Sequence, residues 1–317
     1  MATHEVLWIG IDAGKAELVI DDGRRTYPLA NTGKDIRRWL KHLPGPAHIA
    51  IEATGTFHVE LLEQAFRKGH RLYVIDGFRL NRYRDSVGGR AKTDASDASL
   101  LRRYLRREVD QLRLWEPPPA AYTRLKRLLG RRAKVVQART ALRQSLAGVP
   151  ELQAASRSLL EPITRTLATI DRLIEQTVDK AGLQDPVRRV DDIEGIGPLT
   201  ATAFTTAYLR GPFRSSDAFI AFTGMDVRVR DSGAKAGRRK LSKKGDPELR
   251  RLAHVAAMAA CRSGRWRDLH EANQTRGLTR IQSLVIIARK LARLAFALLK
   301  SGQEYQPNLH REAGATT

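Results

Sequence analysis

Cysteine is almost absent from this sequence of 317 residues: Cys261 stands alone. A single cysteine excludes an intramolecular disulfide and every zinc module built from several cysteines. The sequence also has no G-x-x-x-x-G-K-[ST] motif, which disfavours a function driven by ATP. Residues 281–300 form its most apolar long stretch, but Arg289, Lys290 and Arg293 interrupt it, which predicts a packed helix and not a membrane span.

The amino-terminal stretch MATHEVLWIG lacks a basic segment followed by an apolar core, so we predict no secretory signal and expect a soluble, cytoplasmic protein with no membrane partner. Acidic residues are scarce, with 34 against 56 Lys and Arg, giving a net charge of +22. Such an excess repels itself in the folded state and is typical of proteins that bind polyanions, because Lys and Arg displace counterions from phosphates. The composition therefore favours nucleic acid as a partner.

The first third of the chain alternates strand and helix signals, which predicts an α/β domain over 1–116. We expect three antiparallel strands first, and strand–helix units after them, with a basic loop before the last helix. The expected strands cover 5–12, 16–22, 24–30, 47–52 and 70–76, and the expected helices cover 33–43, 57–68 and 93–106. Thr93 is a plausible N-cap of the last helix.

The prolines at 117–119 mark a boundary, after which the pattern is helical. Leu160, Ile163, Leu167, Ile170 and Ile174 follow a three–four rhythm, which predicts a long helical or coiled-coil connector over 117–186. No acidic residue lies between Glu116 and Glu151, whereas 124–143 contains eight basic ones. A solvated helix face would explain this, but helices usually mix charge signs, so nucleic-acid contact by Arg124, Arg131 and Arg132 is favoured.

A mostly helical third domain is expected over 187–302, followed by a disordered tail over 303–317. Its segment EGIGPLTATAF (194–204) has two glycines and a proline before a helix, a pattern that can present backbone N–H groups to phosphate. Residues 212–223 follow, then a Gly-rich basic loop at 224–245 and helices at 247–262 and 279–300.

Four carboxylates in the first domain could form one site. Asp12 ends the first strand, Glu52 ends the central strand, and Asp94 and Asp97 share one helix face because they are three residues apart. Converging carboxylates repel one another unless divalent cations lie between them, and such cations can assist phosphodiester cleavage. Acids at strand ends also commonly cap neighbouring helices, so spacing alone leaves both interpretations open.

The segments GIDAGK, IEATG and KTDASDA resemble the RuvC-like domain of the DEDD insertion-sequence transposases (insertion-sequence family one-hundred-and-ten), which include Piv-type DNA invertases. EGIGPLTA, DAFIAFTGM and RKLSKKGDPELRRLAHVAAMAA continue the resemblance in the third domain. The resemblance implies an RNase-H-like fold for the first domain and a transposase domain at the end. It also implies that Asp12, Glu52, Asp94 and Asp97 are catalytic ligands, most naturally of Mg²⁺.

A serine is the nucleophile in this family, and Ser242 stands at the matching position. Basic residues surround Ser242, and their positive charges could offset the negative charge of a phosphate bound there. These expected nucleic-acid contacts are Arg238, Arg239, Lys240, Lys243 and Lys244. No general base is evident beside Ser242, and our hypothesis is that an acid or a metal-bound water of the first domain, from the same or another subunit, fills this role. From the residues alone, a serine in a basic loop that only touches DNA is the favoured interpretation, and Ser232, Ser263 and Thr223 are other candidates.

By resemblance, the protein is a mobile-element transposase that cleaves and rejoins target and donor DNA through a phosphoserine intermediate. The family further implies a homo-oligomer (dimer to tetramer) with a composite active site. It also implies a structured noncoding guide (bridge) RNA as a partner, and a location in the bacterial cytoplasm in association with the nucleoid. The alternatives are a site-specific invertase of the same family, a RuvC-like metal-dependent nuclease without a covalent intermediate, and a non-catalytic nucleic-acid-binding protein.

Overall fold

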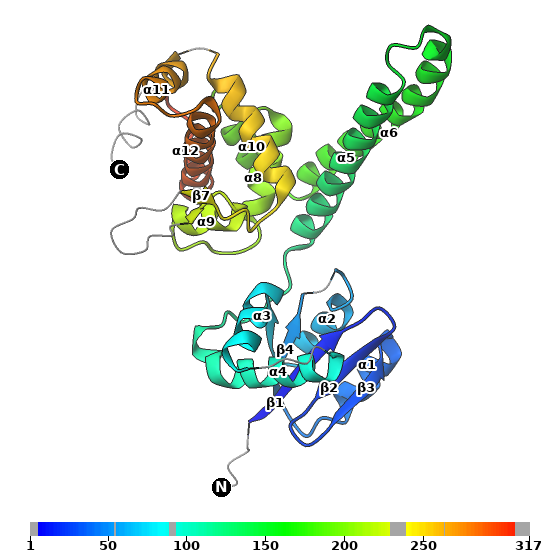
Figure 1. The fold of residues 1–317 in the computed structure, drawn as a ribbon. Coiled ribbons are helices and arrows are strands. Elements are labelled where there is room, and N and C mark those ends of the chain that lie inside the picture. Colours follow the sequence, from blue (N-terminus) through cyan, green and yellow to red (C-terminus); the bar gives the residue numbers. More distant parts are fainter. Residues whose placement is uncertain (1–5, 54, 89–92, 229–238, 263, 308–317) are drawn as a thin grey trace. The chain divides into compact units, whose positions relative to one another are not determined.

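The computed structural model describes residues 6–53, 55–88, 93–228, 239–262 and 264–307 (Figure 1). The chain forms two compact units, residues 1–117 and 118–317. The division falls within the run of prolines at 117–119. Each unit is described by itself.

The first unit is built on a five-stranded sheet with the order β3-β2-β1-β4-β5. Its strands are β1 (Leu7–Ala13), β2 (Glu17–Asp21), β3 (Thr26–Ala30), β4 (Ala47–Glu52) and β5 (Arg71–Ile75). β1 pairs antiparallel with β2, and β2 with β3, while β1, β4 and β5 run parallel. The predicted strands are thus confirmed, including the three antiparallel strands at the start of the chain.

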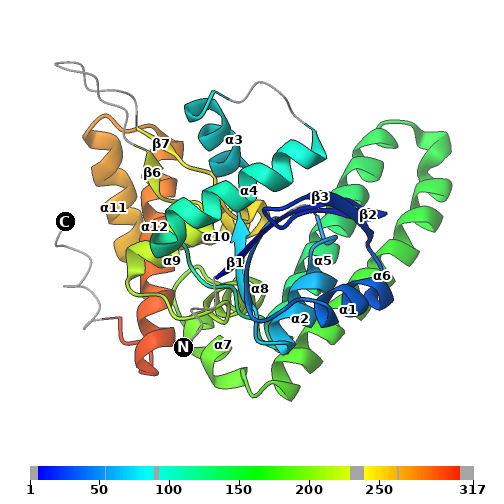
Figure 2. The ribbon, with the colours of Figure 1, turned by 90° about the horizontal axis from the view of Figure 1, so that it is seen from below.

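Helices cover both faces of this sheet (Figure 2). The helices are α1 (Gly33–Lys41), α2 (Val59–Arg67), α3 (Gly77–Ser86) and α4 (Asp94–Glu108), with a short 3-10 turn at Val109–Gln111. Strand side chains alternate between faces. Accordingly, Ile9 and Ile11 share one core with α1 and α2, whereas Ala50 and Tyr73 share another with α3 and α4.

Helix α3 corrects the sequence analysis, which expected only a basic loop between β5 and α4. Asp76 caps this helix by accepting a hydrogen bond from the backbone N–H of Arg79. Only Leu80 and Arg84 are buried along its ten residues, so the apolar periodicity that announces a helix is too sparse to recognise. Capping and the packing of Leu80 stabilise α3 in place of an apolar stripe.

The second unit begins with a hairpin of two long helices, α5 (Ala120–Ser145) and α6 (Gln153–Lys180), with a 3-10 turn at Pro150–Leu152 between them. Of the predicted stripe on α6, Leu167 and Ile174 are buried and Leu160, Ile163 and Ile170 are half-buried. The predicted helical character of this segment is confirmed. Its buried residues Leu125, Leu128 and Ile174 belong to the core that the later helices also form.

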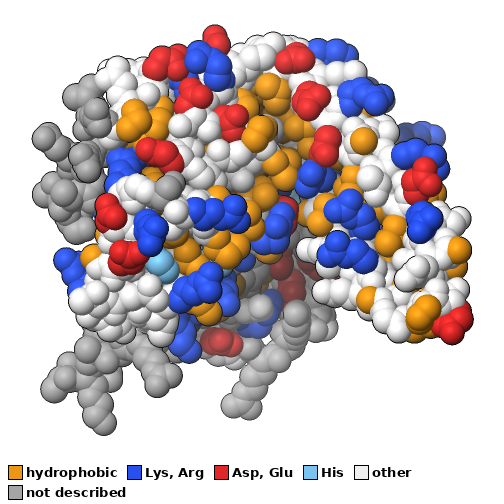
Figure 3. Space-filling model, turned by 90° about the horizontal axis from the view of Figure 1, so that it is seen from above, with side chains coloured by type: hydrophobic (Ala, Val, Ile, Leu, Met, Phe, Trp, Pro, Cys, Tyr) orange, Lys and Arg blue, Asp and Glu red, His pale blue; other side chains and the backbone are white. Residues whose placement is uncertain are grey.

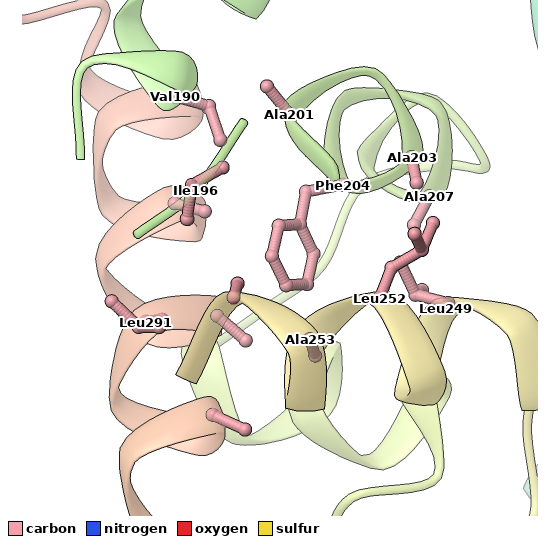
Figure 4. Packing of buried hydrophobic residues seen from close by; sticks show 14 of the residues in the cluster. Val190, Ile196, Ala201, Ala203, Phe204, Ala207, Leu249, Leu252, Ala253 and Leu291 are labelled. Carbon is pink, nitrogen blue, oxygen red and sulfur yellow. The ribbon is translucent and has the colours of Figure 1, made fainter. Parts of the chain in front are cut away.

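Six further helices follow among the described residues of the second unit. They are α7 (Gln184–Asp191), α8 (Pro198–Tyr208), α9 (Ser216–Thr223), α10 (Pro247–Ala260), α11 (Gly264–Thr275) and α12 (Arg280–Ser301). Phe204 of α8 is fully buried, and its ring points towards α10 and Ala253 (Figure 4). Within the described ranges, no helix combines the length and the apolar character needed to cross a membrane.

Three features of the second unit differ from expectation. The segment expected as a loop at 224–245 contains an antiparallel ribbon of β6 (Val227–Arg228) and β7 (Lys240–Leu241). Helix α11 was not predicted, because polar contacts hold it to α12: His270 Nδ1 and Asn273 Nδ2 both contact Ser283 Oγ, at 2.8 and 3.1 Å. At the start of the expected disordered tail, Tyr305 donates a hydrogen bond to Glu194.

Candidate active-site residues

Asp12 and Glu52 lie side by side at the carboxyl ends of neighbouring parallel strands. β1 and β4 are paired through Ile11 and Ile51, and the next residue on each strand is Asp12 and Glu52. Because side chains alternate, both carboxylates point to the same face as Gly10 and Ala50, the face that α3 and α4 cover. Sheet register therefore places two of the predicted acids together.

Helix α4 brings the other two acids to that face. Thr93 caps it within a capping box with Ser96, so Asp94 and Asp97 lie in its first turn, where the helix dipole favours negative charge. α4 packs against β1 at Gly10, where a Cβ atom would lie only 2.0 Å from the carbonyl oxygen of Ala98. A glycine in β1 is thus required for the close approach of the helix to the strand.

A second contact holds α4 to β2. Asp21 is buried, accepts a hydrogen bond of 2.7 Å from Arg102 Nε, and also accepts one from Ser99 Oγ. Asp21 was not among the predicted site residues, and its role here is to anchor the helix that carries Asp94 and Asp97.

The four carboxylates influence one another electrostatically. Burial raises the pKa of Asp12 from 3.8 to about 6, and the negative charges of Asp94, Asp97 and Glu52 contribute to the rise. Burial and like charges both disfavour the ionised form of an acid. The predicted acids therefore form one electrostatic cluster around Asp12, an arrangement that attracts cations.

A cation of the protein already contacts this cluster. Arg84 of α3 donates a hydrogen bond of 2.5 Å from Nη2 to Oδ1 of Asp97, and both side chains are buried. A buried carboxylate requires such a partner to offset its desolvation. No sequence signal points to Arg84, because its segment has the pattern of a loop, whereas helix α3 places this side chain opposite α4.

The chemistry of these donors fits a divalent cation such as Mg²⁺, which prefers carboxylate oxygens. Among the residues that the structure describes, no three His, Cys, Asp or Glu side chains are placed to hold a metal ion together. Asp97 is engaged by Arg84, and Asp94 is exposed at the helix start. The four acids thus match a cation in charge and donor type, and side-chain rotation would be needed for joint coordination.

Gly77 tests the role of Glu52. It is the first residue of α3, and a Cβ atom there would lie 2.3 Å from Oε1 of Glu52. We expect Gly77→Ala to displace this carboxylate and to weaken Mg²⁺ affinity about tenfold, measured by isothermal titration. The same change at Gly45, where an added Cβ would have nothing within 4 Å, is the control. Unchanged affinity in Gly77→Ala would remove Glu52 from cation binding.

In the second unit, Ser242 follows the ribbon directly and is half-buried. Its backbone N–H donates a hydrogen bond of 2.8 Å to the carbonyl of Asp226. Its hydroxyl donates a hydrogen bond to Oδ1 of Asp226 and accepts one of 3.2 Å from the backbone N–H of Lys244. The sequence does not reveal an acid beside Ser242, because Asp226 is sixteen residues earlier and only strand pairing brings the two together.

The predicted basic contacts are distributed unevenly. Arg124, Arg131, Arg239, Lys240, Lys243 and Lys244 are exposed, whereas Arg238 lies outside the described residues. Arg132 instead forms an ion pair of 2.5 Å with Asp171 on α6, so it helps to join the hairpin helices. Basic and acidic side chains are interspersed on the face in Figure 3. Nucleic-acid contact by these residues stays a prediction.

The EGIGPLTATAF segment forms the end of the turn between α7 and α8 together with the first half of α8, and Gly197 occupies the N-cap position of α8. Gly195 has a φ of +84°, and a Cβ there would lie 2.4 Å from the backbone nitrogen of Ala260. This glycine is therefore required for packing of the turn against α10. Phosphate binding by the turn stays a prediction.

Comparisons with known proteins match both units. A DEDD family model described as "Transposase" matches residues 9–150, and another described as "Transposase IS116/IS110/IS902 family" matches residues 187–271. The first range contains Asp12, Glu52, Asp94 and Asp97, and the second contains Asp226 and Ser242.

Curated relatives cover most of the chain. The pilin gene-inverting protein of Moraxella bovis is 25% identical over 272 residues, with 83% of each chain covered. The insertion element IS116 uncharacterized 44.8 kDa protein of Streptomyces clavuligerus is 22% identical, covering 96% of this chain and 97% of the relative. The transposase for insertion sequence element IS1328 of Yersinia enterocolitica is 32% identical over about half of each chain. With two family models in the predicted order and relatives along nearly its full length, the chain belongs to the family of DEDD transposases that includes IS110 and IS116.

Proposed function

We propose that this protein is a DNA recombinase of a mobile element, which cleaves DNA and rejoins it through a phosphoserine intermediate. Family membership supports strand cleavage and transfer in general terms. The observation that carries the finer proposal is that each unit has its own reactive group in place. The acids surround Asp12 in the first unit, and Ser242 is held by hydrogen bonds in the second.

We assign the first unit an RNase-H-like fold of the RuvC type. In support of it, the mixed sheet has the order β3-β2-β1-β4-β5 and carries Asp12 on its central strand. In this assignment, Asp12, Glu52, Asp94 and Asp97 hold Mg²⁺. The bound ion supplies charge stabilisation at the oxygens of the scissile phosphate. The protein contributes the donor oxygens, and Gly10 and Asp21 keep the start of α4 beside β1.

In the second unit, the hydroxyl of Ser242 attacks phosphorus and forms the covalent link to DNA. Lys243 and Lys244, which are exposed next to it, offset phosphate charge. We further propose, from the family resemblance, a homo-oligomer with a composite active site, a guide RNA, and action in the cytoplasm on nucleoid DNA.

Inversion of a DNA segment is the second candidate reaction. The Moraxella bovis relative is named a pilin gene-inverting protein, and its similarity covers 83% of this chain. Inversion and transposition use the same strand cleavage and rejoining, so they differ in the arrangement of the DNA sites. A plasmid assay with inverted and with separate sites would distinguish them.

Ser242→Ala tests the covalent mechanism. We expect no detectable protein–DNA adduct on a nicked suicide substrate, because alanine has no nucleophilic oxygen. Ser158→Ala, at an exposed position of α6, is the matched control and should form adducts like the parent.

Adducts that survive in Ser242→Ala would disprove the role of this serine. Cleavage to free 5′-phosphate ends without any adduct would indicate a RuvC-like nuclease. DNA binding without cleavage by the parent protein would indicate a non-catalytic nucleic-acid-binding protein.

A further inference from the structure

Asp226 is the acidic side chain in direct contact with the hydroxyl of Ser242. The hydroxyl donates its proton towards Oδ1 of Asp226, while its oxygen accepts from the backbone N–H of Lys244. A group that accepts the proton of a nucleophile must lie within hydrogen-bonding distance of it. Asp226 meets this requirement within the second unit alone.

The backbone holds this pair in a defined geometry. The carbonyl of Asp226 accepts from the N–H of Ser242, and the carbonyl of Gly224 accepts from the N–H of Lys243 at 3.1 Å. Lys243 has a φ of +55°, which turns the chain immediately after Ser242. These contacts orient both side chains before any substrate is present, a property typical of reactive sites.

Two glycines allow the flanking segments to touch. A Cβ atom at Gly245 would lie 2.6 Å from the carbonyl oxygen of Phe222, and one at Gly224 would lie 2.9 Å from the nitrogen of Gly245. Gly224 also has a φ of +72° and ends α9. The end of α9 and the turn before α10 therefore pack backbone against backbone, directly beside the Asp226–Ser242 pair.

Positive charge surrounds the pair from several elements. Lys243 and Lys244 follow β7, and Arg250 of α10 donates a hydrogen bond of 2.8 Å to the carbonyl of Gly245. From α12, Arg289 interacts with the charges of two acids. Burial and then Arg293 lower the pKa of this guanidinium, and Asp217 and Asp226 oppose that shift. The Nε of Arg289 is buried and has no hydrogen-bond partner in the structure. Asp226 and Ser242 therefore lie among cationic groups that can offset the charge of a phosphate.

We propose that Asp226 is the general base for Ser242. The proposal rests on the proposed function, in which Ser242 is the nucleophile. As the bond between Oγ and phosphorus forms, the hydroxyl proton passes to Oδ1 of Asp226, which later releases it to solvent. The bond from phosphorus to the departing sugar oxygen breaks, that oxygen keeps the electron pair, and it takes a proton from water. One ester replaces another, with no oxidant or reductant required.

Asp226→Asn tests this role, because it preserves the size of the side chain and leaves the backbone pairing of the ribbon unchanged. We expect the rate of adduct formation on the suicide substrate to fall about 10²- to 10⁴-fold, since an amide cannot take the proton. Asp226→Glu should recover part of the rate. Glu271→Gln, at an exposed ion pair with Arg267 on α11, makes the same acid-to-amide change as a control.

The pH profile distinguishes a general base from a residue that only positions Ser242. Between about pH 6 and about pH 9, the ratio of parent to Asp226→Asn rates should shrink about tenfold per pH unit, because hydroxide replaces the missing base. DNA binding by gel shift and the unfolding temperature should match the parent. If Asp226 only positions Ser242, the ratio of parent to Asp226→Asn rates should not change with pH.

The outcomes separate the two proposals. Adducts that form in Ser242→Ala refute the nucleophile and, with it, the proposed function. If Ser242→Ala forms no adduct but Asp226→Asn forms it at the parent rate, the base assignment is wrong and the serine mechanism stands. A slow Asp226→Asn variant with a pH-independent ratio likewise refutes the base, and leaves Asp226 a positioning residue.

Discussion

Asp12→Asn is expected to abolish strand cleavage and, at the same time, to stabilise the metal-free fold. Cleavage should fall by about a thousandfold, because the substitution removes one proposed cation ligand from the site to which we assign stabilisation of the transition state. Stability should rise, because the pKa of Asp12 is raised to about 6 by burial and by Asp94, Asp97 and Glu52. An acid whose folded pKa lies above its unfolded value destabilises the fold once it is ionised.

The sign of this effect sets its pH dependence. Asp12 loses its proton near pH 3.8 in the unfolded chain and near pH 6 in the folded chain. The destabilisation caused by its ionisation therefore grows between about pH 4 and about pH 6, and it is complete above about pH 6. The side chain is half-buried and partly screened, so we expect a gain of about 1 kcal/mol for Asp12→Asn at neutral pH. The gain should vanish below about pH 4.

Thermal unfolding with and without Mg²⁺, together with a cleavage assay, measures both effects. Added Mg²⁺ should narrow the difference in unfolding temperature, because a bound cation offsets the repulsion in the parent. Glu63→Gln, which removes an exposed acid paired with Arg67 on α2, should change neither cleavage nor the pH profile. Parent-like cleavage by Asp12→Asn would contradict the proposed cation site.

Gly10→Ala should unfold or severely destabilise the first unit. Its Cβ would lie 2.0 Å from the carbonyl oxygen of Ala98 and 2.4 Å from the nitrogen of Arg102. These are backbone atoms of α4, so the whole helix must move away from β1. Overpacking of this kind typically costs about 3 kcal/mol in the free energy of unfolding, and here it also separates Arg102 from Asp21.

Chemical denaturation of the parent and the variant measures this cost. Gly45→Ala is the matched control, since a Cβ there has nothing within 4 Å and its φ is ordinary. We expect the control to stay within about 0.5 kcal/mol of the parent. A similar result for Gly10→Ala would show that α4 does not need this glycine to dock.

Much of the fold was predictable because strands and long helices have regular patterns of apolar residues that can be recognised in the sequence. The five strands are short runs of apolar and β-branched residues between turn signals, and α6 repeats its apolar residues every three or four positions. Helices α3 and α11 were missed for the opposite reason. Asp76 caps the first, and Ser283 binds the second through side-chain hydrogen bonds, neither of which leaves a hydrophobic period.

The candidate site shows the same division. Resemblance to a family identified Asp12, Glu52, Asp94, Asp97 and Ser242 as candidate site residues, because each lies in a short motif that can be recognised in the sequence. The ribbon that joins Asp226 to Ser242 has strands of only two residues each, too short to carry a pattern. Arg132 is predicted to contact nucleic acid from its basic neighbourhood, and the structure adds an ion pair with Asp171 of the next helix that no local pattern reveals.

The sequence by itself determined the excess of basic residues that favours a nucleic-acid partner, the order of the strands in the first unit, and the positions of the four candidate acids. Only the tertiary structure decided which groups meet those residues: Arg84 on Asp97, Gly77 against Glu52, and Asp226 on Ser242. The physical reason is that composition and periodicity are local properties of the chain. Hydrogen bonds and close approaches depend instead on the register of strands and the docking of helices far apart in sequence.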